Sequence, residues 1–270
     1  MLITINAFYS ELLNNEREIA IFLPPRYNRH RRKRYPVIYL QDGQRLFDRG
    51  STPGSMQWGI DLVALPLMKN HLVQELIMVG ISHSADREYE YTPTYDEEEQ
   101  GGGGADRYCQ FLISELKPFI DDHFRTLSSR SNTAIGGSSL GGLLALYAGI
   151  TYGHIFGKIA CISPSLWWNN YTILEYVQTR QPLQPRPRIW LDTGTDEEES
   201  DDLLDWPAED DELDPLEQAQ LLAEIFVRQG YRRGRNLRFF TGYGASHDEF
   251  SWGARFDRIL RFLFAHKRSP

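Results

Sequence analysis

Cysteine is scarce in this chain of 270 residues, where only Cys109 and Cys161 occur, both among apolar neighbours. This scarcity argues against a disulfide framework and a cysteine-based zinc site, and it makes a reducing compartment the expected one. The chain also lacks an apolar run near the ~20 residues that a membrane-spanning helix needs. Its N-terminus shows no basic stretch followed by an apolar segment, as a secretory signal would. We therefore expect a cytoplasmic protein without a membrane span.

Apolar residues, by contrast, are plentiful. They make up 41% of the chain, and aromatics make up 13%. This composition is enough to build a sizeable core and excludes a mostly disordered chain. No internal repeat with a period of about 20 to 50 residues is present, and no change of composition marks a linker between two large domains. We expect residues 1–270 to form a single domain.

Negative charge is concentrated in one segment. The formal net charge is −8, yet residues 196–214 contain twelve Asp or Glu and no Lys or Arg, so the rest of the chain would carry +4. Like charges at this density repel, and we expect an acidic, solvated insert at about 198–214. A calcium site is the alternative, but the segment lacks the spacing of an EF-hand loop. The insert argues weakly against a nucleic-acid surface, and the basic cluster at 29–34 favours a solvated loop between strands.

Strand-like and helix-like segments alternate along the chain. The expected strands are 17–23, 35–41, 76–81, 132–137, 157–163, 188–193 and 236–241, and the expected helices are 58–68, 105–124, 140–150, 216–229 and 250–264. The segment 82–104, with its four consecutive glycines, is expected to be a loop. Such alternation predicts an α/β protein with a mostly parallel central sheet, helices on both faces and right-handed crossovers.

A G-x-S-x-G sequence stands at one of the predicted strand-to-helix junctions. It comprises residues 137–141, with Ser139 at its centre. The turn at such a junction is so tight that only glycine fits two positions before and two after the nucleophile. Ser139 would then expose its Oγ above the sheet, and the N–H of Leu140 would face an oxyanion. The alternative is a Gly-Ser turn that only packs a helix closely on a strand.

A serine nucleophile needs a general base, which is most often a histidine held by a carboxylate. In α/β-hydrolases the base follows the nucleophile and the acid in the chain. His154 follows Ser139 too closely, and His266 lies at the end of the chain. His247 follows the last predicted strand in a glycine-rich loop and is therefore the candidate base, the alternative being a histidine at a helix entry without a special role.

The acid should follow the preceding strand, 188–193. The loop there reads Gly194-Thr195-Asp196-Glu197. The pattern alone leaves both Asp196 and Glu197 open as the carboxylate that orients the imidazole.

Several further motifs stand in a recognisable order. They are YPVIYLQDGQRLFD (35–48), REYEYTP (87–93), ELKPFI (115–120), IGGSSLGG (135–142), SPSLWW (163–168), and Ser246-His247 followed by Trp252 and Arg255. Over roughly residues 7–265 the chain resembles the putative esterase family of α/β-hydrolases. That family includes enterochelin-type siderophore esterases, feruloyl esterase domains, S-formylglutathione hydrolases and mycolyltransferases. The long acidic insert departs from the family's pattern.

The resemblance implies the α/β-hydrolase fold and assigns roles by matching positions. Ser139 matches the nucleophile and His247 the base. The family's G-T-x-[DE] loop makes Glu197 the first choice for the acid and Asp196 the second.

The resemblance also implies the surroundings of the triad. Leu140 matches the first oxyanion donor and Gln44 the second, both through the backbone N–H. Trp167 and Trp168 would line the substrate pocket, with core aromatics as the equally weighted alternative.

The expected function is that of a serine hydrolase that cleaves a carboxylic ester through an acyl-enzyme. A siderophore, hydroxycinnamoyl or short acyl ester would be the small-molecule substrate, with no metal or organic cofactor and with neither nucleic acid nor membrane as a partner. The sequence does not indicate the oligomeric state. An acyltransferase that uses the same triad is one alternative, and a non-catalytic binding module that kept the fold is the other.

Overall fold

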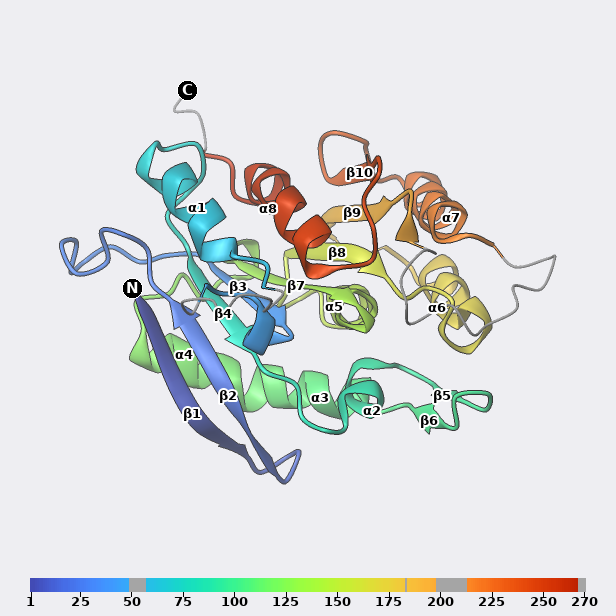
Figure 1. The fold of residues 1–270 in the computed structure, drawn as a ribbon, viewed down its shortest axis with the longest axis horizontal. Coiled ribbons are helices and arrows are strands. Elements are labelled where there is room, and N and C mark those ends of the chain that lie inside the picture. The colour runs from blue at the N-terminus through green and yellow to red at the C-terminus, as the bar shows by residue number, and fades with distance from the viewer. Residues whose placement is uncertain (49–56, 183, 198–212, 267–270) are drawn as a thin grey trace.

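An eight-stranded sheet forms the centre of the protein (Figure 1). The computed structural model describes residues 1–48, 57–182, 184–197 and 213–266. The strand order is β1-β2-β4-β3-β7-β8-β9-β10. β1 pairs antiparallel with β2, and β2 with β4, whereas every neighbouring pair from β4 to β10 is parallel. The strands are β1 (Leu2–Ser10), β2 (Asn15–Phe22), β3 (Val37–Gln41), β4 (Ile77–Ile81), β7 (Thr133–Ser139), β8 (Lys158–Pro164), β9 (Arg188–Gly194) and β10 (Leu237–Gly242).

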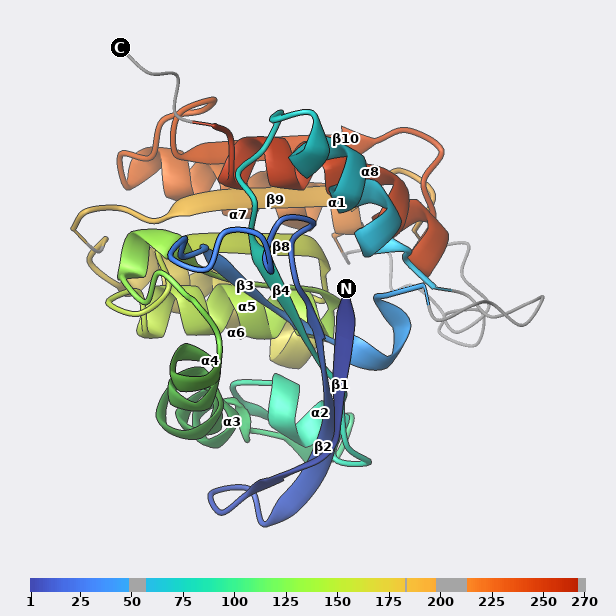
Figure 2. The same cartoon turned by 90° about the vertical axis from the view of Figure 1, so that its left-hand side faces the viewer.

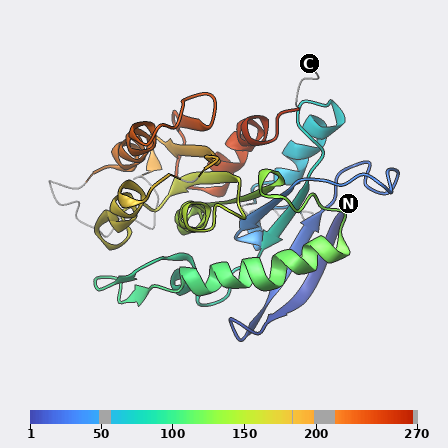
Figure 3. The ribbon, with the colours of Figure 1, turned by 180° about the vertical axis from the view of Figure 1, so that it is seen from behind.

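Helices cover both faces of this sheet, as Figures 1 and 2 show. They are α1 (Ile60–Lys69), α2 (Arg87–Tyr91), α3 (Ala105–Phe111), α4 (Lys117–His123), α5 (Leu140–Thr151), α6 (Trp168–Thr179), α7 (Pro215–Arg228) and α8 (Glu249–Leu263). Buried side chains of α1 and α8 belong to one core cluster, and those of α3 to α7 belong to the other. α3 continues into α4 through one π turn, and the two form the long rod in Figure 3. The prediction of a mostly parallel sheet with helices on both faces is confirmed.

The central strands are buried almost throughout because each faces a helical layer on both sides. Every residue of β3 and β4 is buried, as are all residues of β7 except its last. The continuous apolar run of β4 and the four apolar residues that begin β3 are typical of a sheet covered on both faces. The sequence therefore showed these strands clearly.

Three parts of the fold differ from the expectation, and the first is α6 (Trp168–Thr179), where no helix was predicted. The segment 82–104 is not a plain loop, because it contains α2 and a short ladder of β5 (Tyr95–Asp96) with β6 (Gly101–Gly102). Two of the four glycines thus lie in a strand. β1 was also missed, since it is an edge strand that is only partly buried and lacks a continuous apolar run.

The structure tests the prediction for the basic segment but not the prediction for the acidic one. The basic residues 29–34 are exposed in the connection between β2 and β3, as predicted. Residues 198–212 of the predicted acidic insert lie outside the described residues, so the solvated-insert and calcium interpretations stay predictions. Within the ranges that the structure describes, no helix is long and apolar enough to cross a membrane.

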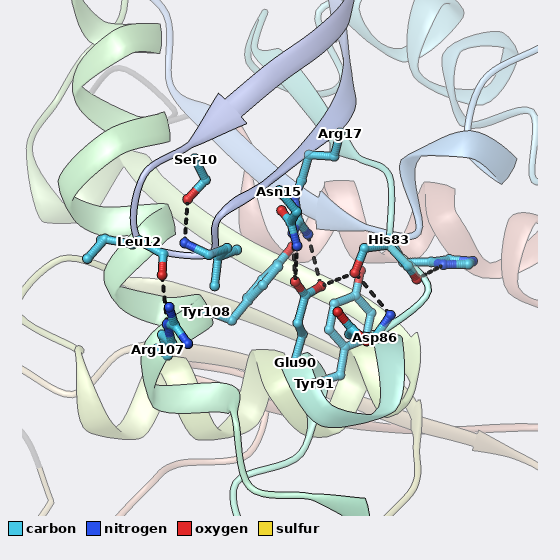
Figure 4. A network of polar contacts seen from close by, with 12 residues as sticks. Ser10, Leu12, Asn15, Arg17, His83, Asp86, Glu90, Tyr91, Arg107 and Tyr108 are labelled. Atoms are coloured by element: carbon cyan, nitrogen blue, oxygen red, sulfur yellow. Dashed lines mark hydrogen bonds and ion pairs between the residues drawn. The ribbon is translucent and has the colours of Figure 1, made fainter.

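A buried ion pair ties the N-terminal hairpin to the rest of the molecule (Figure 4). Arg17 of β2 donates to both carboxylate oxygens of Glu90 in α2, at 2.7 and 3.0 Å. The guanidinium also lies over the ring of Tyr108, whose hydroxyl donates to Gln41 Oε1 at 2.7 Å. The network therefore reaches from the hairpin to the carboxyl end of β3.

Candidate active site

Ser139 occupies a strained turn at the junction of β7 and α5. Its backbone angles are φ 56° and ψ −128°, a region that residues other than glycine rarely adopt. A Cβ atom added to Gly137 would lie 2.6 Å from the carbonyl oxygen of Gly141, so position 137 has no room for a side chain. The tight turn that the G-x-S-x-G sequence predicted is therefore present at this junction.

The hydroxyl of Ser139 contacts a second serine. Its Oγ lies 3.1 Å from Ser165 Oγ, in the segment that follows β8. Ser165 is buried, and its backbone N–H donates to Ser139 O at 3.2 Å. Within the described residues no hydrogen bond joins Ser139 to His247.

The N-terminus of α5 begins directly after Ser139, with Leu140 as the first helical residue. The first N–H groups of a helix have no acceptor within that helix, and the helix dipole places positive potential there. An oxygen that becomes negative above Ser139 would be stabilised at this point.

Gln44 lies in a loop that packs against the same helix end. It belongs to a single 3₁₀ turn, η1 (Gly43–Arg45), that follows β3. A Cβ atom added to Gly141 would lie 3.3 Å from Asp42 Oδ2, so the loop and the start of α5 are in close contact. Arg87 fixes the loop by donating to both oxygens of Asp42, at 2.8 and 2.9 Å.

His247 and Glu197 form a direct pair. His247 Nδ1 lies 3.2 Å from Glu197 Oε2. Burial alone would raise the pKa of Glu197, but the hydrogen bond with His247, together with those from Ser163 and Gly194, holds that pKa below its usual value. An ionised carboxylate can only accept, so the imidazole donates from Nδ1 and its Nε2 is left as an acceptor.

Asp196, the alternative acid, is directed elsewhere. Its carboxylate accepts from Thr195 Oγ1 at 2.7 Å, and its backbone N–H donates to Ala245 O at 3.2 Å. The geometry therefore separates two neighbouring carboxylates that the pattern could not separate.

The sheet topology brings these residues to one edge. β7, β8, β9 and β10 are consecutive and parallel, so their carboxyl ends lie side by side (Figure 1). Ser139 is the last residue of β7, Glu197 follows β9 and His247 follows β10. The carboxyl edge of a parallel sheet is where active sites of such folds gather.

The two tryptophans have different environments. Trp168 is 2% exposed, belongs to the main core cluster and donates from Nε1 to Thr94 O at 2.9 Å. Trp167 is 40% exposed. Trp168 thus fits the core interpretation, and Trp167 alone presents its indole at the surface.

Sequence reasoning gave no role to several polar residues around the triad candidates. Ser163 and Asp192 are buried at the ends of β8 and β9, and Arg255 is buried in α8. The available signal was the polar residues that close two apolar strands, together with an arginine on the inner face of an amphipathic helix.

A family model described as putative esterase matches residues 10–263. The chain belongs to the putative esterase family. A siderophore triacetylfusarinine C esterase of Aspergillus fumigatus is 29% identical over 187 residues, which are 63% of this chain and 61% of that protein. The uncharacterized protein YbbA of Bacillus subtilis is 28% identical over 193 residues, which are 70% of this chain and 72% of that protein.

Solved structures of hydrolases and esterases share the fold. An IroE-like serine hydrolase from Shewanella oneidensis superposes with a TM-score of 0.76 at 23% identity, over 98% of this chain and 80% of that chain. The enterobactin esterase of Shigella flexneri superposes with a TM-score of 0.71 at 21% identity, over 97% and 59%. The predicted family and the α/β-hydrolase fold are confirmed, and as a family member the chain is a carboxylic-ester hydrolase.

Proposed function

We propose that this esterase cleaves its substrate through an acyl-enzyme on Ser139. His247 takes the proton of the Ser139 hydroxyl at Nε2 as Oγ attacks the ester carbonyl. Glu197 holds the imidazole in the tautomer that leaves Nε2 free and stabilises the imidazolium that forms. Before attack, the hydroxyl turns from Ser165 toward His247.

The oxyanion of the tetrahedral intermediate would be held by two backbone N–H groups, those of Leu140 and Gln44. His247 then gives its proton to the leaving alcohol. Water attacks the acyl-enzyme with His247 as the base, which releases the acid and restores Ser139. Each step uses side chains or N–H groups of this chain alone.

One observation carries the proposal most strongly. The Glu197–His247 pair lies at the same sheet edge as a serine whose backbone is strained, and the three residues come from the carboxyl ends of β7, β9 and β10, within one run of four parallel strands. Backbone strain of this kind persists only where the surrounding structure enforces it, and it is typical of active sites.

For the substrate we propose a small-molecule carboxylic ester of the siderophore or hydroxycinnamoyl kind. Support comes from the relatives, which are named siderophore triacetylfusarinine C esterase, enterobactin esterase and ferulic acid esterase. Release of acid from triacetylfusarinine C, from enterobactin and from methyl ferulate, compared at equal concentrations, would identify the ester class. Turnover of none of the three would contradict this part of the proposal.

Hydrolysis of p-nitrophenyl acetate and butyrate tests the mechanism. We expect the wild type to release nitrophenol and the variants Ser139→Ala and His247→Ala to lose at least about 10³-fold in kcat. His154→Ala is the matched control, since that histidine is exposed in the turn that follows the C-terminal end of α5. Wild-type rates in Ser139→Ala would contradict the mechanism.

A further inference from the structure

We propose that Arg255 is a positioning residue that acts through Ser163 to aim the Glu197 carboxylate at His247. The proposal rests on the triad proposed above and adds a buried layer beneath it. Asp192 completes this layer as the counter-ion of Arg255.

The direction of the hydrogen bonds follows from the chemistry of the groups. Arg255 Nη2 lies 2.8 Å from Ser163 Oγ. A guanidinium has no acceptor, so Ser163 Oγ must accept this bond. The single proton of the Ser163 hydroxyl is then free to be donated to Glu197 Oε1, with which Ser163 forms a short contact. Arg255 thereby fixes which way Ser163 points.

The two oxygens of Glu197 have separate partners. Oε1 receives the Ser163 hydroxyl and the backbone N–H of Gly194, the latter at 2.5 Å. Oε2 is left for His247. With one oxygen held from two directions, the carboxylate cannot rotate about its terminal bond without breaking both bonds. The imidazole therefore meets an acceptor whose position is set in advance.

Asp192 makes the burial of Arg255 possible. Asp192 Oδ1 lies 3.3 Å from Arg255 Nη2, and its side chain is fully buried. It is held in turn by Trp190 Nε1 at 2.6 Å and by the backbone N–H of Ser163 at 3.2 Å. It is the nearer of two carboxylates around the guanidinium, since Glu197 Oε1 lies 3.9 Å from Arg255 Nη2, and a buried charge is tolerated only with such compensation.

This arrangement is a poor way to stabilise the fold. Arg255 Nε and Nη1 are buried without a hydrogen-bond partner among the described residues. Burial also raises the pKa of Asp192 to about 6, although Arg255 and Trp190 favour its ionised form. Buried ion pairs with unsatisfied donors contribute little stability or reduce it. The loss of stability is explained if the network orients Glu197 for the reaction.

Two glycines provide the space that the network needs. A Cβ atom on Gly242 would lie 2.9 Å from Arg255 Nη1, and a Cβ atom on Gly194 would lie 3.0 Å from Glu197 Cγ. These glycines are paired across β9 and β10. The ends of both strands thus leave room for the guanidinium and the acid loop at the same level of the sheet.

The test measures kcat and KM with p-nitrophenyl butyrate for Ser163→Ala, Arg255→Met and Arg255→Lys. It also follows the downfield ¹H NMR signal of the His247 Nδ1 proton, which reports the bond to Glu197. We expect Ser163→Ala and Arg255→Met to lose about tenfold or more in kcat, with KM within about twofold, and to lose or shift the proton signal. Arg255→Lys should recover part of the kcat and part of the proton signal, since an ammonium can donate to Ser163 and balance the charge of Asp192.

Arg17→Met is the matched structural control. Arg17 is as buried as Arg255, at 4% exposure, and is also paired with a glutamate. Its loss should lower the melting temperature and leave the His247 proton signal in place. If Arg255→Met fails to fold, Ser163→Ala decides, because it removes one oxygen atom and leaves the ion pair intact.

Glu197→Gln, measured in the same assay, separates this inference from the triad. A wild-type kcat and an unchanged proton signal in Ser163→Ala, with Glu197→Gln inactive, would overturn the positioning role and leave the triad standing. If Glu197→Gln also kept wild-type activity, the proposed acid itself would be overturned, and this inference with it.

Discussion

At the residue scale, the direction of a side chain decides which of two neighbouring carboxylates can pair with the candidate base. Asp196 and Glu197 are neighbouring carboxylates in one loop. Glu197 is 4% exposed and pairs with His247, whereas Asp196 pairs with Thr195. The residues alone could place the acid in this loop. Choosing between Asp196 and Glu197 required the path of the backbone after Gly194, which decides which carboxylate reaches His247.

Replacing each acid by its amide tests this distinction. We expect Glu197→Gln to lower kcat by about 10³- to 10⁴-fold, because an amide no longer fixes the tautomer of His247. Asp196→Asn should stay within about twofold of the wild type. Steady-state kinetics on one nitrophenyl ester would measure both. A large loss in Asp196→Asn with an active Glu197→Gln would reverse the assignment.

Asp192 makes stability depend on pH. Its folded-state pKa of about 6 lies above the ordinary 3.8, so the native protein holds a proton that the unfolded chain releases between these values. The stability that the native protein gains from holding this proton is fully present below about pH 4. It is lost as the pH rises through about 6. We therefore expect Asp192→Asn to gain stability relative to the wild type as the pH rises from about 4 to 7, by up to about 3 kcal/mol. Urea unfolding at several pH values measures the difference, and a gap that does not change with pH would contradict the expectation.

At the scale of elements, the carboxyl ends of the strands position the candidate catalytic residues. β3 and β4 were predictable because residues buried on both faces form apolar runs. α2 and the β5–β6 ladder were not, since elements of five and two residues leave too short a pattern. α2 nevertheless carries Arg87, which holds the loop of Gln44.

A substitution at Gly43 tests how closely the turn after β3 packs against β4. A Cβ atom there would lie 2.5 Å from the backbone C of Gly80 and 2.5 Å from the backbone N of Ile81. Gly43→Ala must therefore move η1, and the N–H of Gln44 with it. We expect a stability loss of about 1–3 kcal/mol and at least about a tenfold loss in kcat.

Gly234→Ala is the control for Gly43→Ala. Its Cβ would have no heavy atom within 4 Å, but its φ of +77° makes a side chain strained. It should lower the melting temperature and leave kcat unchanged. Equal kcat in both variants would remove Gln44 from the oxyanion site.

At the scale of the whole molecule, the order of parallel strands assembles the site. Ser139, Glu197 and His247 are far apart in sequence but lie at or after the carboxyl ends of β7, β9 and β10, which belong to one run of four parallel strands. The sequence predicted β2 to β4, β7 to β10, the longer helices except α6, and the order of the candidates, because these depend on local patterns. The buried layer of Ser163, Asp192 and Arg255 depends on contacts between three elements, and no local pattern shows such contacts.

Labelling with a fluorophosphonate probe tests the central claim, a serine nucleophile at position 139, most directly. Trypsin would release residues 131–158 and 159–180 as separate peptides, so a label on Ser139 is distinguished from one on Ser165, 3.1 Å away. We predict one label, on Ser139, that disappears in Ser139→Ala and is strongly slowed in His247→Ala. No labelling of the folded wild type, or a label on Ser165 in its place, would contradict the account.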